Sequence, residues 1–212
     1  MSTARRHLLV TAGPTREHID PVRYLSNESS GLMGFAIAAE GARAGHQVTL
    51  IAGPVCLEAP QGVRRVDVIS ARDMLAAVEE AFQDADVLFM AAAVADFRPR
   101  HRLQGKWKRK EQGPGPLQLT LVENPDVLAS VAAEKGDRRV VAFALETDDG
   151  ERRAMEKLRA KNADWIVLND PSAQGATRSS VVVLSAAGVV ARIEDEPKEV
   201  IARALLGIAL GG

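Results

Sequence analysis

The sequence predicts an α/β protein with a Rossmann-like, doubly wound and mostly parallel sheet, a flexible flap and a C-terminal hairpin. Strand-like and helix-like segments alternate along the 212 residues, which is typical of a parallel sheet covered by helices. One long charged segment interrupts this alternation, and the tail contains two strand-like runs around the turn-forming residues 186–188. We treat 1–212 as a single domain, because this length suits one sizeable core.

Hydrophobic periodicity locates the elements in chain order. The expected strands are 7–13, 48–52, 66–69, 87–93, 140–145 and 165–168, followed by the hairpin strands 181–184 and 189–193. The expected helices are 33–44, 74–82, 150–162 and 197–210. One more helix is expected to start after Asn124-Pro125-Asp126, because proline is favoured in the first turn of a helix and a polar residue precedes it.

Composition argues against several classes of function. The hydrophobic fraction of 46% and the charged fraction of 26% are ordinary for a globular protein. A net charge of -1 argues against a nucleic-acid or membrane-surface binder, so any anion site must be local. No apolar run approaches the roughly 20 residues that cross a bilayer. The single cysteine, Cys56, fits a reducing compartment, and we expect a cytoplasmic protein.

The junction between the first strand and the first helix is a candidate anion site. The strand ends at Gly13, and Ser29, Ser30 and Gly31 bring hydroxyls and backbone amides to the helix start, where the macrodipole favours phosphate. An ordinary N-cap would also explain Ser-Ser-Gly. The long polar connection before the helix favours a ligand site, because a cap needs only one or two residues.

Residues 98–116 form the charged segment, which we expect to be a flap. It contains seven cations, namely Arg98, Arg100, Arg102, Lys106, Lys108, Arg109 and Lys110. A long connection of this kind is usually functional or disordered. Like charges this close repel one another unless an anion compensates them, so a polyphosphate ligand and a solvated charged loop both stay open from spacing alone.

Several blocks, in order along nearly the whole chain, resemble phosphopantothenoylcysteine synthetase, an enzyme often fused to a flavin-dependent decarboxylase. The first blocks are 11–17 (Thr-Ala-Gly-Pro-Thr-Arg-Glu), 20–27 (Asp-Pro-Val-Arg-Tyr-Leu-Ser-Asn), 29–31 (Ser-Ser-Gly) and 33–34 (Met-Gly). The later ones are 91–97 (Ala-Ala-Ala-Val-Ala-Asp-Phe), 106–109 (Lys-Trp-Lys-Arg), 124–127 (Asn-Pro-Asp-Val), 143–147 (Phe-Ala-Leu-Glu-Thr) and 169–170 (Asn-Asp). Together these blocks are highly specific, whereas any one of them alone would be weak.

The resemblance implies a two-step ligation in coenzyme A biosynthesis. The carboxylate of 4'-phosphopantothenate attacks the α-phosphate of CTP, which releases pyrophosphate and gives an acyl-cytidylate. The amine of L-cysteine then attacks the activated carbonyl to give 4'-phosphopantothenoylcysteine. The likeness to bacterial family members implies CTP rather than ATP, Mg²⁺ with the nucleotide, and a homodimer, whereas the metal ligands are unknown.

The resemblance also assigns roles to residues of this sequence. The implied nucleotide-binding residues are Met90, Ala91, Ala92, Asp96, Lys106, Pro125, Asp126, Val127, Leu128, Phe143, Lys157 and Lys161. By spacing alone, Lys157 and Lys161 are only two cations on one helix face, which a surface helix tolerates easily. Asn27, Lys106 and Arg23 are the expected catalytic residues, with Asn27 as oxyanion donor and Arg23 as a phosphate or structural contact. Gly13, Ser29, Ser30 and Gly31 are expected to bind substrate or phosphate.

The chain departs from the family pattern at two positions. Leu32 stands where the family commonly has lysine, and Arg109 replaces the last lysine of the family's Lys-x-Lys-Lys motif. No decarboxylase domain precedes Met1, so we expect a stand-alone synthetase or one half of a fusion, and no flavin on this chain.

Two other hypotheses about the function stay open. A non-catalytic nucleotide-binding module would need the same binding residues. An NAD(P)-dependent oxidoreductase would share the sheet, but no G-x-G-x-x-G follows the first strand and Tyr24 lacks a lysine four residues on.

Overall fold

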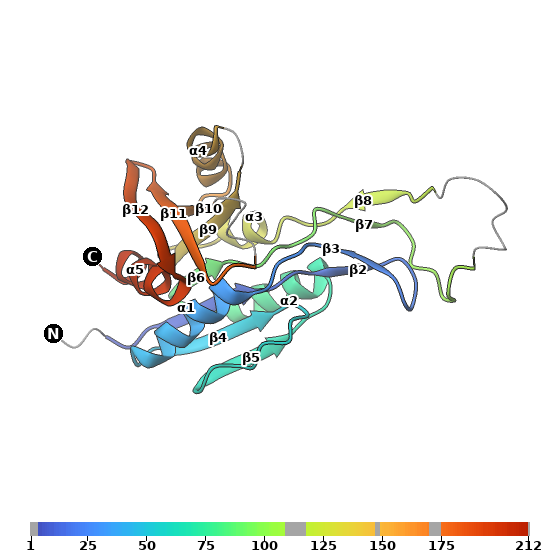
Figure 1. The fold of residues 1–212 in the computed structure, drawn as a ribbon, viewed down its shortest axis with the longest axis horizontal. Coiled ribbons are helices and arrows are strands. Elements are labelled where there is room, and N and C mark those ends of the chain that lie inside the picture. The colour runs from blue at the N-terminus through green and yellow to red at the C-terminus, as the bar shows by residue number, and fades with distance from the viewer. Residues whose placement is uncertain (1–3, 109–117, 147–148, 170–174, 212) are drawn as a thin grey trace.

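An eight-stranded sheet forms the centre of the computed structural model, which describes residues 4–108, 118–146, 149–169 and 175–211 (Figure 1). Six strands are mutually parallel and adjacent in the order β10 (Trp165–Asn169), β9 (Arg139–Leu145), β6 (Val87–Met90), β1 (His7–Ala12), β4 (Gln47–Ala52) and β5 (Val63–Asp67). The antiparallel hairpin of β11 (Arg178–Ser185) and β12 (Gly188–Pro197) continues the sheet beyond β10. The predicted mostly parallel sheet with a C-terminal hairpin is therefore confirmed.

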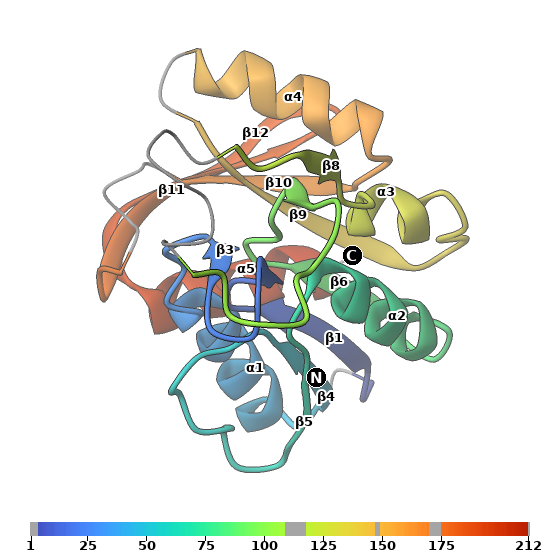
Figure 2. The ribbon, with the colours of Figure 1, turned by 90° about the vertical axis from the view of Figure 1, so that its right-hand side faces the viewer.

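Helices cover both faces of the sheet, because its central strands are apolar on both sides. On β1, Leu8 and Val10 pack with α1 (Leu32–Arg43) and α5 (Lys198–Leu210). Leu9, between them in sequence, packs in the other cluster with α2 (Ala71–Phe82), α3 (Val127–Ala132) and α4 (Gly150–Ala160). Successive side chains of a strand point to opposite faces, so one buried strand serves two cores. In Figure 2, β1 and β4 lie between α1 and α2.

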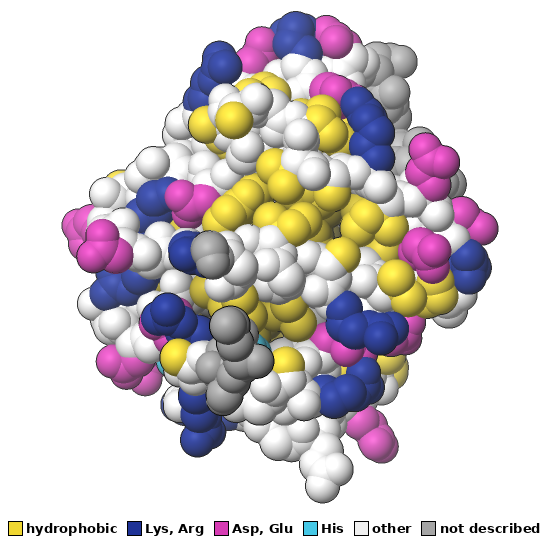
Figure 3. Space-filling view, turned by 90° about the vertical axis from the view of Figure 1, so that its left-hand side faces the viewer, with side chains coloured by type: hydrophobic (Ala, Val, Ile, Leu, Met, Phe, Trp, Pro, Cys, Tyr) yellow, Lys and Arg dark blue, Asp and Glu magenta, His cyan; other side chains and the backbone are white. Residues whose placement is uncertain are grey.

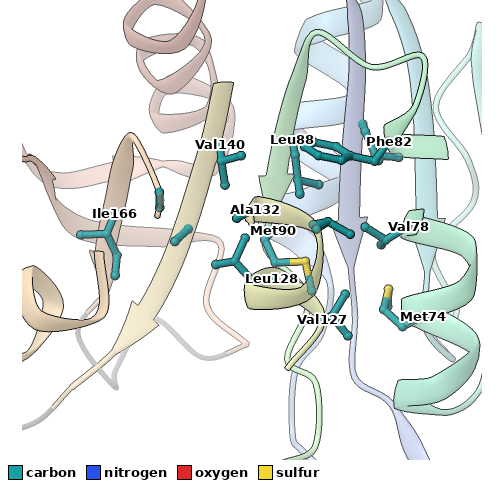
Figure 4. Packing of buried hydrophobic residues seen from close by; sticks show 14 of the residues in the cluster. Met74, Val78, Phe82, Leu88, Met90, Val127, Leu128, Ala132, Val140 and Ile166 are labelled. Carbon is teal, nitrogen blue, oxygen red and sulfur yellow. The ribbon is translucent and has the colours of Figure 1, made fainter. Parts of the chain in front are cut away.

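The core that contains Leu9 shows how the helices pack against the sheet. Met74, Val78 and Phe82 of α2 are at helical spacing and point towards Leu88 and Met90 of β6 (Figure 4). Ser70 starts α2 as a capping box, because its side chain accepts a hydrogen bond from the Asp73 amide, and the Asp73 carboxylate accepts one from the Ser70 amide. In the part of the chain that the structure describes, no helix is long and apolar enough to cross a membrane.

Some predicted boundaries were wrong. The strand expected at 66–69 is β5, Val63–Asp67, an edge strand whose polar and partly exposed residues hide it in the sequence. Parallel pairing with β4 sets its register, with Val48 opposite Val63. The strand expected to run to residue 93 ends at Met90. The helix expected to end at 162 ends at Ala160, because Asn162 has a φ of 49°, in the left-handed region, and cannot continue the helix.

Two short antiparallel pairs project from one end of the sheet and were not predicted as strands (Figure 1). They are β2 (Arg16–His18) with β3 (Tyr24–Ser26), and β7 (Phe97–Pro99) with β8 (Leu121–Glu123). We call 16–26, 97–108 and 118–123 the arm. The described part of the expected flap, 98–108, belongs to the arm, and Leu103 N donates a hydrogen bond of 2.9 Å to Ile19 O within it. Arg109 and Lys110 lie outside the described residues.

The amino ends of the parallel strands lie on the face seen in Figure 3, where hydrophobic side chains gather at the centre and charged side chains surround them. A hollow of about 540 Å³ lies at this end between Arg6, Lys135, Arg138 and Arg139. These cations hold the chain together, because Arg139 Nη1 donates to Ala209 O at 2.7 Å and Lys135 Nζ contacts Asp164 at 2.7 Å. Ligands of open α/β sheets bind at the opposite, carboxyl ends of the strands.

Candidate active site

Two adjoining cavities lie at the carboxyl ends of β1, β6 and β9. The first, of about 250 Å³, is lined by 29–34, 91–93, 143–145, Asn169, Gly175 and Lys198, and we call it the serine cavity. The second, of about 510 Å³, is lined by Met90, 92–97, 123–128, Phe143 and Lys161, and we call it the proline cavity. Ala92, Ala93 and Phe143 line both, so the two cavities share one wall. Two ligands bound there could meet at that wall.

The loop before α1 brings backbone amides to the serine cavity. Gly31 is the N-cap of α1 at φ 79°, and no side chain caps this helix, so its first amides are not bound by a capping residue. A Cβ on Gly34 would lie 2.5 Å from Ala12 Cβ and 2.7 Å from Thr11 O, so only glycine lets α1 pack this closely on β1. Ser29 and Ser30 line the same cavity. This is the geometry of an anion site at a helix start.

Gly13 supports this loop rather than lining it. A Cβ on Gly31 would lie 3.3 Å from the backbone nitrogen of Gly13, so the two glycines pack closely. Gly13 directly follows β1 and has a φ of 77°, in the left-handed region. Gly13 lines neither cavity.

Acidic residues and Lys161 surround the proline cavity. Asp126 caps α3 by accepting from Ala129 N at 3.0 Å, and its other carboxylate oxygen lies 3.2 Å from Lys161 Nζ. Asp96 is exposed and its carboxylate makes no hydrogen bond or ion pair with any described residue. Asn124 Nδ2 donates to Ala95 O at 2.8 Å and so ties the two sides of the cavity together. Met90, Pro125, Val127 and Leu128 supply apolar wall.

The predicted oxyanion donor Asn27 lies beside the shared wall. Its Nδ2 donates a hydrogen bond of 3.0 Å to the carbonyl of Ala93, although Asn27 lines neither cavity itself. The preceding Ser26 Oγ donates to Thr15 O at 2.8 Å, which fixes the end of β3. An amide nitrogen has a second hydrogen, so Asn27 can donate to a bound group while holding Ala93.

Arg23 and Lys106 lie in the arm, outside both cavities. The buried Asp20 carboxylate accepts from the backbone amides of Val22 and Arg23, each at 2.8 Å, from Arg23 Nε at 2.8 Å and from Trp107 N at 3.1 Å. Arg23 Nη2 also donates to Trp107 O at 2.6 Å. Burial raises the pKa of Asp20, but these hydrogen bonds, the Arg23 side chain's foremost, bring it well below the usual range. Of the two roles expected for Arg23, this arrangement favours the structural one.

Lys157 of α4 and Lys161, the C-cap of that helix, lie in different places. Lys161 lines the proline cavity, whereas Lys157 lies outside both cavities and contacts Glu146 Oε1 at 2.5 Å. The hydrogen bond from Lys157 lowers the pKa of Glu146. Of this pair, only Lys161 at the C-terminal cap of α4 therefore lines a cavity.

Two polar residues of the serine cavity were given no site role from the sequence. They are Asn169 at the end of β10, which belongs to one of the blocks that resemble the family, and Lys198 at the start of α5. Lys198 follows Pro197 at a helix start, which by itself is only a structural signal. Its burial depends on how α5 packs against the sheet, and no sequence pattern records that.

Within the described ranges, no group of three His, Cys, Asp or Glu side chains could hold a metal ion. The carboxylates of Asp96 and Asp126 line one cavity, however. Mg²⁺ is commonly held by one or two carboxylates together with substrate phosphates, so these residues fit a metal that arrives with a nucleotide.

The fold and the cavities define a doubly wound α/β protein whose candidate ligand site lies at the carboxyl edge of the sheet. The model of the family described as DNA/pantothenate metabolism flavoprotein C-terminal domain matches residues 3–210. The chain belongs to this family. The resemblance predicted from the sequence motifs is confirmed by this match and by the relatives.

The chain is 48% identical over 167 residues to the coenzyme A biosynthesis bifunctional protein CoaBC of Escherichia coli K12, covering 78% of this chain and 41% of that protein. It is 43% identical over 172 residues to the protein of the same name from Bacillus subtilis, covering 81% of this chain and 42% of that protein. The chain thus spans less than half the length of these curated relatives. A crystal structure of the C-terminal domain of CoaBC matches with a TM-score of 0.84 at 36% identity, covering 99% of this chain and 96% of that one.

Proposed function

We propose that this chain is a phosphopantothenate-cysteine ligase of coenzyme A biosynthesis, which joins 4'-phosphopantothenate to L-cysteine with CTP as the energy source. Family membership and the relatives named for coenzyme A biosynthesis support the reaction class. The observation that carries the proposal is the wall of Ala92, Ala93 and Phe143, shared by two cavities of different character. A ligation through a mixed anhydride needs two sites that meet at the reacting carboxylate.

In this proposal CTP occupies the proline cavity and 4'-phosphopantothenate the serine cavity, with its carboxylate at the shared wall. A carboxylate oxygen forms a bond to the α-phosphorus, and the bond from that phosphorus to the bridging oxygen breaks, so that pyrophosphate leaves. Catalysis of such a displacement is mostly positioning and charge neutralisation. Lys161 neutralises phosphate charge, and Mg²⁺ held by Asp96 and Asp126 would add to that neutralisation when bound.

The second step joins cysteine to the activated acyl group. The cysteine amine attacks the carbonyl carbon, the carbonyl oxygen becomes an oxyanion, and the bond to the cytidylate oxygen breaks as CMP leaves and a proton passes to solvent. A tetrahedral oxyanion needs fixed donors. Asn27 is suited to this role, because its hydrogen bond to Ala93 holds its amide beside the shared wall. Lys106 on the arm would act as a clamp on the phosphates when the arm closes.

We also propose that the chain works as a homodimer. Val22, Tyr24, Phe97, Leu103 and Leu121 of the arm are 38% to 58% exposed, although all are large and hydrophobic. Clustered exposed apolar side chains mark interaction surfaces. The hairpin, which exposes Val189 and Val190, is the other place where two copies could join. Light scattering of Tyr24→Ser and Val190→Ser variants would decide between the two surfaces.

A coupled assay of pyrophosphate release tests the proposal. We expect release with CTP, Mg²⁺, 4'-phosphopantothenate and cysteine, and much less with ATP in place of CTP. Nucleotide binding without pyrophosphate release would instead favour the non-catalytic module. A change in NADPH fluorescence on mixing would favour the oxidoreductase. The cytoplasmic location stays a prediction.

A further inference from the structure

A buried threonine lies behind the wall that the two cavities share. Thr15 follows the end of β1 by three residues, is fully buried and lines neither cavity. Its hydroxyl accepts a hydrogen bond of 3.0 Å from the backbone amide of Ala95. Ala95 belongs to the segment 92–97, which lines the proline cavity. Because this amide is buried, the threonine hydroxyl fixes its position where water does not replace the bond.

The backbone of Thr15 makes two further connections. Thr15 N donates a hydrogen bond of 3.3 Å to the carbonyl of Ala93, which also accepts the bond of 3.0 Å from Asn27 Nδ2. Thr15 O accepts a hydrogen bond of 2.8 Å from Ser26 Oγ, and Ser26 directly precedes Asn27 in the sequence. The three polar groups of Thr15 thus connect the segment 92–97 with the end of β3.

The position of the Asn27 amide depends on these connections. Asn27 is exposed, and its side chain makes a single hydrogen bond with described residues, the one to Ala93 O. Packing therefore does little to fix it. Its two anchors are Ala93 O and the preceding Ser26, and both of them bind Thr15. A shift of the segment 92–97 relative to β3 would move the Asn27 amide, and a displacement of about 1 Å in an active site can cost about a hundredfold in rate.

We propose that Thr15 is a positioning residue, which keeps the Asn27 amide at a fixed separation from the nucleotide that the segment 92–97 binds. The inference rests on the proposed ligase function and adds a residue to it. Thr15 touches no substrate. It acts through Ala95 on one side, and through Ala93 and Ser26 on the other. The separation matters most in the cysteine step, because the oxyanion then forms beside Asn27 while the acyl group is still bonded to the cytidylate.

Rapid-quench kinetics of Thr15→Val test the proposal, because valine keeps the shape of threonine and removes only the acceptor of Ala95 N. We expect the cysteine step to slow at least about tenfold, with the KM values for CTP and 4'-phosphopantothenate nearly unchanged. Thr15→Ser keeps the hydroxyl and should recover most of the rate. A purely structural role would lower the melting temperature of Thr15→Val without changing the cysteine step of the folded enzyme.

Ser26→Ala interrupts the same connection from the other side, and it covers the case in which Thr15→Val does not fold, because Ser26 is exposed. It should slow the same step. The double variant should be at most about twofold slower than the slower single variant, since one break already disconnects Asn27 from the segment 92–97. Multiplied effects in the double variant, or an unchanged cysteine step in either single variant, would overturn the proposal.

Thr49→Val is the matched control. Thr49 is also a buried threonine with a bonded hydroxyl, which lies 2.9 Å from His7 Nε2, and it lines neither cavity. Both half-reactions of this variant should match those of the wild type. A cysteine step slowed as much as in Thr15→Val would mean that any buried threonine has this effect, and would contradict the role of Thr15.

A measurement without catalysis separates this inference from the ligase function. The side-chain amide resonances of Asn27, assigned by ¹⁵N NMR from Asn27→Asp, should shift in Thr15→Val and return towards their wild-type positions in Thr15→Ser. Unchanged resonances in Thr15→Val would contradict the connection. If the resonances shift as expected but the wild-type chain releases no pyrophosphate, the ligase function alone is rejected.

Discussion

The backbone amide of Trp107 donates a hydrogen bond of 3.1 Å to the buried carboxylate of Asp20, although the two residues lie 87 positions apart in the sequence. This bond joins the β2–β3 side of the arm to the segment that carries Lys106. Arg23 strengthens the connection, because it contacts both the Asp20 carboxylate and the Trp107 carbonyl. The position of Lys106 therefore depends on Asp20.

Asp20→Ala should loosen the arm. It removes the acceptor of several donors at once, so the melting temperature should fall by several degrees and proteases should cleave near 100–108 faster than in the wild type. Arg23→Gln should do the same more weakly, because Asp20 keeps its backbone partners. Equal protease resistance of wild type and Asp20→Ala would disprove the connection. The pKa of Asp20 lies below its ordinary value of about 3.9. The Asp20 carboxylate therefore stabilises the fold fully above that pH, and this stabilisation is lost only in stronger acid.

Asn27→Asp should slow the cysteine step selectively. A carboxylate cannot donate to the oxyanion, and loss of one such donor typically costs about 10² to 10³ in rate. We expect the acyl-cytidylate to accumulate in rapid-quench experiments while its formation is little affected. If both half-reactions slowed equally, Asn27 would not be the donor.

Lys106→Gln should lower turnover with little change in melting temperature. Lys106 is exposed, and its side chain makes no hydrogen bond or ion pair with another described residue. Arg64→Gln is the control, because Arg64 is an exposed cation on β5, away from both cavities. The proposal predicts a loss of activity for Lys106→Gln alone; similar activities of the two variants would count against a clamp.

His46 should make the stability of the fold depend on pH. It is nearly buried and its Nδ1 accepts a hydrogen bond of 3.3 Å from Arg6 N, so the folded state needs a neutral ring. Burial, and then the charge of Arg6, lower the pKa of His46 below its ordinary 6.5. The unfolded chain therefore binds more protons in the window just below pH 6.5, and stability should fall there as the pH falls. Urea melts of His46→Gln should show a flatter pH dependence in that window.

Gly34→Ala should destabilise the fold and disturb the serine cavity. The new methyl group would overlap Ala12 Cβ and Thr11 O, and overpacking of this kind typically costs about 1 to 3 kcal/mol. Gly207→Ala on α5 is the matched control, because nothing lies within 4 Å of its added Cβ. That variant should gain up to about 1 kcal/mol from helix propensity, as measured by chemical denaturation. A neutral Gly34→Ala would mean that α1 can shift away from β1.

The sequence predicted the central strands well because they are buried on both faces, and burial leaves continuous apolar runs such as Leu8 to Val10. It misplaced β5, whose arginines are compatible with a solvent-exposed edge but not with the apolar pattern used to find strands. It missed the strands of the arm for a related reason. Each has three residues, too few for an alternation to be recognised, and pairing with a distant segment rather than local propensity makes them strands.

Some residues of the candidate site could likewise be predicted from the sequence, and others could not. The positions of Ser29, Ser30 and Gly31 could be predicted, because their types mark a helix start after a strand, and a parallel sheet brings such starts to one edge. Pro125 and Asp126 by themselves predicted only a helix start, and their place in the site was implied by the family resemblance. The separation of Lys161 from Lys157, and the placement of Arg23 and Lys106 in the arm, could not be predicted from spacing. By itself, the sequence determined the fold class, the family and the edge of the sheet where the candidate site lies. Only the tertiary structure decided which side chains share a cavity and that Lys198 is buried in one, because burial and charge environment depend on contacts between segments far apart in the chain.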